Sequence, residues 1–158
     1  KWLIYTNNPK ARVIERAKKL QIDYKIFTKD ELYNGSVLNC INSLNPELII
    51  LAGFLLKFPI EIINVYNKKI INIHPALLPK YGGKGMYGMN VHKAIIKNKE
   101  VVSGITIHYV NKKYDEGPII FQKEIKINSS YTPNDLANKI HDLEMEYFPK
   151  IVENLLTL

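Results

Sequence analysis

The sequence has few of the residues that mark secreted or membrane proteins. Its single cysteine, Cys40, excludes an internal disulfide, and no apolar run approaches the ~18 residues of a membrane span. Arginine is scarce, since only Arg12 and Arg16 stand among 22 basic residues. These absences favour a cytoplasmic protein without a membrane partner.

The net charge of +7 is spread along the chain instead of being concentrated. Lysine pairs such as Lys18-Lys19 and Lys112-Lys113 are typical of solvated faces, so we expect no nucleic-acid partner. A phosphorylated small substrate suits this charge equally well. The length of 158 residues fits one domain with one core.

Apolar periodicity predicts an α/β fold. We expect an alternation of strands and helices, with strands at 2–5, 24–27, 48–52 and 69–73 and helices at 11–20, 28–44 and 59–65. The run from Thr28 to Glu31 predicts a capping box at the start of the second helix, and Gly35 is a candidate interruption of it. This order predicts a Rossmann-like, mostly parallel sheet with helices on both faces. Strands at 104–110 and 119–125 predict an antiparallel C-terminal pair, and a helix at 91–97 and one from 133 onward complete the prediction.

Three polar residues are candidates for catalysis. Asn72 and His74 lie two apart at the end of a strand, where both side chains can donate to one oxygen and stabilise an oxyanion. Asp115 lies in a turn between two strands, and a carboxylate beside a histidine raises its pKa and keeps it protonated. The alternative is that Asn72 and His74 only bond loop backbone and that Asp115 is an ordinary turn residue.

Metal and nucleoside triphosphate sites are poor interpretations of the remaining motifs. The four histidines, His74, His92, His108 and His141, show no zinc-ligand spacing, so we expect no metal. We interpret His92 and His108 as structural residues or as supports of the functional side chains, and not as ligands. The run Gly82-Gly83-Lys84-Gly85 lacks the Gly-Lys-Ser/Thr of a phosphate-binding loop and predicts a mobile loop beside the substrate.

Three motifs together resemble the glycinamide ribonucleotide formyltransferase family over nearly the whole chain. They are the run from Asn72 to Tyr81, the run Asp115-Glu-Gly-Pro-Ile-Ile and the segment from Leu51 to Leu55. The resemblance implies the formyltransferase fold and attack of the substrate amine on the formyl carbon of 10-formyltetrahydrofolate. Asn72 and protonated His74 would stabilise the tetrahedral intermediate, with Asp115 keeping His74 charged and assisting proton transfer.

The same resemblance implies the binding residues. The formyl folate would contact the residues from 55 to 58 and the loop that ends at Asp115, and Glu144 would bind glycinamide ribonucleotide. The folate contacts by residue are Leu55, Leu56, Lys57, Phe58, Asn72 and Lys29. The family's first strand and its Gly-x-Gly-x-Asn phosphate turn have no counterpart here, so we expect a single formyltransferase domain over 1–158 that is incomplete at its N-terminus. A monomer or homodimer is expected.

Other functions remain open at this point. Methionyl-tRNA formyltransferase and formyltetrahydrofolate deformylase share the same Asn, His and Asp logic, but both carry an additional domain. A non-catalytic folate- or nucleotide-binding module is the alternative from a different class. We expect an enzyme, and substitution of His74 or Asp115 by alanine should abolish most turnover.

Overall fold

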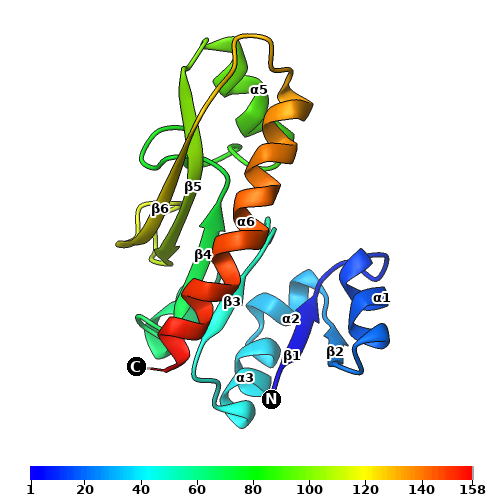
Figure 1. Ribbon diagram of the computed structural model, residues 1–158. Helices are drawn as coiled ribbons and strands as arrows, with labels where there is room; N and C mark the ends of the chain where they lie inside the picture. Colours follow the sequence, from blue (N-terminus) through cyan, green and yellow to red (C-terminus); the bar gives the residue numbers. More distant parts are fainter. Residues whose placement is uncertain (158) are drawn as a thin grey trace. The chain divides into compact units, whose positions relative to one another are not determined.

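The computed structural model describes residues 1–157 as two compact units, the first from Lys1 to Pro46 and the second from Glu47 onward (Figure 1). The first unit contains a pair of parallel strands and three helices. Its elements are β1 (Leu3–Thr6), α1 (Arg12–Lys19), β2 (Asp23–Ile26), α2 (Lys29–Tyr33) and α3 (Ser36–Leu44).

The helix predicted over 28–44 is divided in two. Its predicted start is confirmed, because the Thr28 hydroxyl accepts from the Glu31 amide at 3.2 Å and the Glu31 carboxylate accepts from the Thr28 amide at 2.7 Å. Gly35 then adopts a φ of 92°, a left-handed conformation that glycine tolerates, and the backbone turns before α3.

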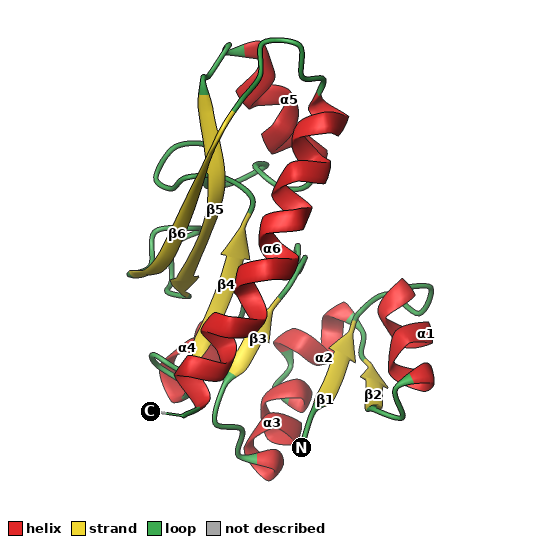
Figure 2. Cartoon of the chain, in the orientation of Figure 1, coloured by secondary structure: helices red, strands yellow, loops and turns green. Residues whose placement is uncertain are grey.

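The second unit contains a four-stranded sheet of order β3-β4-β5-β6 (Figure 2). Its elements are β3 (Ile49–Leu51), α4 (Ile60–Val65), β4 (Ile70–His74), α5 (Met89–Lys97), β5 (Val102–Tyr109), β6 (Ile119–Lys126) and α6 (Pro133–Leu156). The β3 and β4 strands are parallel, whereas β4 with β5 and β5 with β6 are antiparallel. The predicted α/β class with its antiparallel C-terminal pair is confirmed, and the antiparallel pairing of β4 with β5 was not expected.

Helices α5 and α6 supply the apolar layer of this unit. Val91 and Ile95 of α5 pack with Leu136 and Ile140 of α6 against Ile105 of β5 in one buried cluster. All five residues are at most 1% exposed, and this packing fixes the sheet under the two helices. Within residues 1–157, no helix combines the length and the apolarity needed to cross a membrane.

The opposite sheet face carries polar side chains. The register pairs Asn72 with His108 and His74 with Thr106, so these four residues project to one side, away from the face that carries Ile105 and its neighbours. All except Asn72 are buried. This face therefore carries the side chains of β4 and β5 that can form hydrogen bonds or exchange protons.

Candidate active site

The histidine at the end of β4 is held from two sides. His74 is 4% exposed, and its Nε2 atom lies 2.7 Å from the carbonyl oxygen of Tyr81. A carbonyl can only accept, so Nε2 carries a proton and donates it. The other ring nitrogen, Nδ1, lies 3.6 Å from Oδ2 of Asp115, beyond hydrogen-bond distance. In neutral His74, the unprotonated nitrogen is therefore the one nearest the carboxylate.

The loop between β5 and β6 brings Asp115 to the polar face, as predicted. Asp115 adopts a φ of 55°, and its Oδ2 atom accepts from the Gly83 amide at 2.8 Å. Glycine at position 82 permits this close approach, because a Cβ atom there would stand 2.6 Å from Leu78 Cδ2 and 3.1 Å from Asp115 Cβ and would displace both side chains. The glycine-rich segment thus supports the Asp115 carboxylate directly.

His108 lies in the site as a support of the candidate residues, one of the two roles expected for it, but sequence reasoning did not connect it with Asn72 and Asp115. Its Nδ1 atom donates to the Tyr109 carbonyl at 2.9 Å, and in the neutral ring Nε2 then accepts from the Asn72 amide nitrogen at 3.2 Å. That Nε2 atom also lies 3.6 Å from Asp115 Oδ1. The Asn72 amide retains a second N–H for a ligand. The signal that could have found His108 is the alternation of β5, which places it on the face of Thr106.

Burial decides the charge of His74. Burial lowers the pKa of His74, with the charge of His108 acting in the same direction, and together they exceed the raising effects of Asp115 and of the Tyr81 carbonyl. The expectation that His74 is a cation near neutral pH is therefore wrong for the free protein. Burial raises the pKa of Asp115, but the imidazoles and the Gly83 amide outweigh it, and this carboxyl is ionised.

A buried hydroxyl fixes the turn that follows His74. Thr106, fully buried, donates to the Ala76 carbonyl at 2.7 Å and accepts from the Leu78 amide at 3.0 Å. Gln122 of β6 donates to Thr106 at 2.9 Å and to the Leu78 carbonyl at 3.0 Å. Because these bonds satisfy the backbone of the turn, residues 75–78 have one position relative to the sheet.

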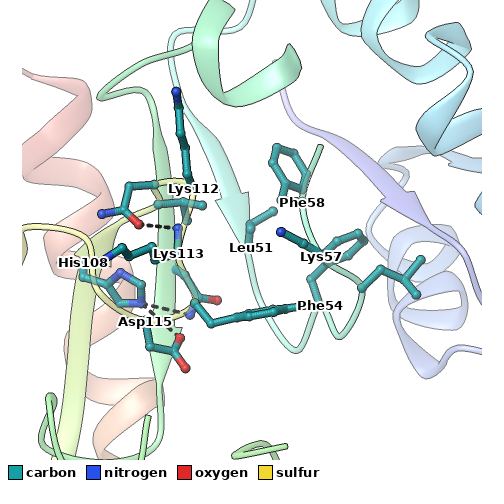
Figure 3. A pocket seen from close by; sticks show the side chains of 13 residues that line it. Leu51, Phe54, Lys57, Phe58, His108, Lys112, Lys113 and Asp115 are labelled. Carbon is teal, nitrogen blue, oxygen red and sulfur yellow. Dashed lines mark hydrogen bonds and ion pairs between the residues drawn. The ribbon is translucent and has the colours of Figure 1, made fainter. Parts of the chain in front are cut away.

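A small cavity of about 80 Å³ lies beside Asn72, His108 and Asp115 (Figure 3). Across the cavity in Figure 3, the side chains after β3 face the Asp115 loop, and Phe54 meets Phe58 edge-on with ring centroids 5.7 Å apart. Of the predicted folate contacts, it contains Leu56, Lys57 and Phe58 together with Asn72. Its volume is below the range of about 300–1,000 Å³ that is typical of pockets for small molecules, so it can receive only part of a ligand.

A larger cavity of about 850 Å³ contains Asn72, His74 and Asp115 and reaches α6. Glu144 lines it, as does the predicted folate contact Leu55. Burial raises the pKa of Glu144, and the neighbouring His141, 3.5 Å away, acts in the opposite direction with a smaller effect. The volume is within the range of pockets that bind small molecules, about 300–1,000 Å³.

The remaining predicted site residue is Lys29, which belongs to the first unit. Lys29 begins α2 in the first unit and lines neither of the two cavities described, so its folate contact stays a prediction. Among residues 1–157, no group of three or more histidine, cysteine or acidic side chains is arranged to hold a metal ion.

The formyl transferase family matches residues 2–152 of this sequence. The match includes the three polar residues, the glycine-rich segment and both cavities, and it covers the two compact units. The chain belongs to the formyl transferase family.

Within that family, the chain is similar to phosphoribosylglycinamide formyltransferases. It is 35% identical to the chloroplastic protein of Arabidopsis thaliana over 95% of this chain and 53% of the relative, and 35% identical to the Bacillus subtilis protein over 99% and 80%. Among solved structures, those from Anaplasma phagocytophilum and Streptococcus pneumoniae match with TM-scores of 0.86 and 0.88. Their identities are 30% over 96% of this chain and 72% of the former, and 26% over 98% and 86% for the latter.

The chain spans about half the length of the two plant relatives, from Arabidopsis thaliana and Vigna unguiculata. The structural matches extend over both compact units, and the matched structures support the α/β fold of this chain. The single-domain organisation expected from the sequence stays a prediction.

Proposed function

We propose that the protein transfers the formyl group of 10-formyltetrahydrofolate to the amine of 5'-phosphoribosylglycinamide, a step of purine synthesis. The observation that carries the proposal is His74, buried at a cavity wall between the Tyr81 carbonyl and the Asp115 carboxylate. Family membership and the names of the relatives support the same reaction.

The tautomer of His74 supports a proton path in this proposal. The amine attacks the formyl carbon while Nδ1 of neutral His74 accepts one proton from the amine, because Nε2 already carries its proton. His74 becomes an imidazolium beside Asp115, and Asn72 donates its remaining N–H to the oxyanion. When the carbon–nitrogen bond to the folate breaks, Nδ1 returns the proton to the folate nitrogen. Proton and charge therefore balance within the site.

The low pKa of free His74 fits this path. An imidazole that is neutral at pH 7 can accept a proton, and Asp115 stabilises the cation only once it forms. The cationic His74 expected from the sequence is thus proposed for the intermediate and not for the free protein.

The two cavities support a division between the substrates. The small cavity, of about 80 Å³, would take only one end of the folate, between Phe54, Phe58 and the Asp115 loop, and the rest of the folate would lie outside it. The phosphoribosylglycinamide would occupy the large cavity, where Glu144 can accept a hydrogen bond from the neutral amine. Both cavities include Asn72 and Asp115, so the reacting atoms would meet there.

A formylation assay with purified protein tests the proposal. Formation of formylated phosphoribosylglycinamide from the two substrates without added metal is expected, and His74→Ala should reduce kcat at least about 10³-fold. Formation of formylmethionyl-tRNA would instead indicate a methionyl-tRNA formyltransferase. Release of formate without the amine substrate would indicate a formyltetrahydrofolate deformylase. Folate binding without turnover would indicate a binding module.

A cytoplasmic location and a monomeric or homodimeric state also stay predictions. Cell fractionation and sedimentation of the protein at assay concentration measure them directly.

A further inference from the structure

Tyr81 connects the active-site histidine to the far end of α5. Its carbonyl oxygen accepts from His74 Nε2, while its hydroxyl donates to Glu100 Oε1 at 2.9 Å and accepts from the Asn98 side chain at 2.9 Å. Lys80 donates to the same Glu100 oxygen at 3.3 Å. The hydroxyl contacts of Asn98 and Glu100 with Tyr81 are called the Tyr81 clamp below.

The backbone at this position needs external support. Tyr81 has a φ of 56°, a left-handed conformation that a bulky side chain disfavours. The Tyr81 ring packs against the cluster formed by α5 and α6, and the clamp fixes the end of that ring at the residues that follow α5. The carbonyl position therefore depends on contacts made at the opposite end of the side chain.

We propose that Tyr81 is a positioning residue for His74, in which the Tyr81 clamp holds the carbonyl oxygen on Nε2 and so leaves Nδ1 as the atom that exchanges protons. The role in turnover rests on the proposed function, whereas the effect on the His74 proton does not. Without the clamp, the strained backbone relaxes, the carbonyl leaves Nε2, and either ring nitrogen can carry the single proton of neutral His74.

The charges around His74 give the sign of the effect. Asp115 from the β5–β6 loop and the Tyr81 carbonyl raise the pKa of His74, and the charge of His108 on β5 lowers it. His92 on α5 interacts electrostatically with His74 as well. Loss of the carbonyl contact removes one raising effect, so the pKa of His74 falls when the clamp is broken.

Tyr81→Phe is the direct test, because phenylalanine keeps the ring in the core and removes only the hydroxyl. An NMR titration of the His74 ring should show a lower pKa and a mixture of tautomers in the variant. In the formylation assay we expect kcat to fall about tenfold, with KM for both substrates within about twofold, because proton transfer is impaired and binding is retained. The acid limb of the kcat profile should move to lower pH.

Three further variants separate positioning from stability. Tyr147→Phe removes a hydroxyl from a ring packed on the same cluster and should leave the His74 titration and kcat unchanged. Glu100→Gln keeps an acceptor oxygen and should behave as the parent, whereas Glu100→Ala should reproduce part of the Tyr81→Phe effect. If Tyr81→Phe does not fold, Glu100→Ala carries the test.

An unchanged His74 pKa and tautomer in a folded clamp variant would overturn the proposal, as would a loss confined to Tm and KM. The NMR measurement needs no substrate. A protein that shows the shift but does not formylate phosphoribosylglycinamide would contradict the proposed function and leave the positioning role in place.

Discussion

The two faces of the β3-β4-β5-β6 sheet are built from alternate residues of the same strands and have opposite properties. Ile71, Ile105 and Ile107 contact the helical layer, and each is fully buried among apolar side chains. The residues between them, Asn72, Thr106 and His108 among others, form directional hydrogen bonds. Apolar packing depends on volume, whereas a hydrogen bond depends on one atom in one place, so the two faces should respond differently to small substitutions.

The largest expected difference is at Asp115, the charge at the end of the polar face. Asp115→Asn keeps the shape and removes the charge that would stabilise cationic His74, so we expect kcat to fall about 10³-fold. Because Asp115 raises the pKa of His74, the acid limb of the pH profile should move to lower pH in the variant. Steady-state kinetics from about pH 5 to about pH 9, a range that includes the ordinary pKa of histidine, measure both effects.

Asp142→Asn is the matched control for that measurement. Asp142 lies exposed on α6 and lines neither cavity described, so its substitution should leave kcat and the profile unchanged. Turnover within a few-fold of the parent in Asp115→Asn would contradict the proposed role of the charge.

Adjacent residues of β5 provide the next comparison. Thr106→Val preserves volume but leaves the Ala76 carbonyl and the Leu78 amide without their buried partner, at a cost of about 2–4 kcal/mol in the free energy of unfolding. Ile107→Val removes one buried methylene from the apolar face and should cost about 1 kcal/mol. Only Thr106→Val should also lower kcat, because it releases the turn after His74.

Urea unfolding with equal slopes, together with kcat of the folded variants, checks this pair. Equal losses of stability with unchanged kcat in both would mean that the hydrogen bonds of the polar face do not position the turn.

Much of the fold follows from local sequence patterns. The capping box at Thr28, the glycine at position 35 and the alternation along β5 are short-range signals, and each gives the local structure found. The antiparallel pairing of β4 with β5 is different, since it is decided by which strand edges meet in the folded unit. Periodicity identifies strands but does not give their neighbours.

The same limit explains what the sequence could not give for the site. His74 and Asp115 stand in recognisable motifs, but His108 joins them only because the register sets it opposite Asn72. The charge of His74 depends on burial, which is a property of the whole fold and exceeds the effect of the Asp115 carboxylate. Neither the position of His108 beside Asn72 nor the burial of His74 can be inferred from the spacing of residues in the motif.

The smallest expected effect concerns Glu144, which reaches the large cavity from α6, the helix that covers the apolar face. Glu144→Gln should raise KM for phosphoribosylglycinamide about tenfold with little change in kcat, because a charged hydrogen bond in the bound state is weakened. It should also raise Tm at neutral pH. Burial raises the pKa of Glu144, so the folded state binds its proton more tightly than the unfolded state, and the ionised carboxylate destabilises the fold.

The stability contribution of Glu144 depends on pH. The favourable contribution of the protonated carboxyl is complete below the ordinary range of a glutamate, near about pH 4, and is lost as the pH rises through the raised value. Glutamine does not titrate, so the Tm advantage of Glu144→Gln should grow from pH 4 to 7 (roughly the titration range). Glu153→Gln, exposed on the same helix, is the control. A Tm difference independent of pH would show that burial of the Glu144 charge is not the cause.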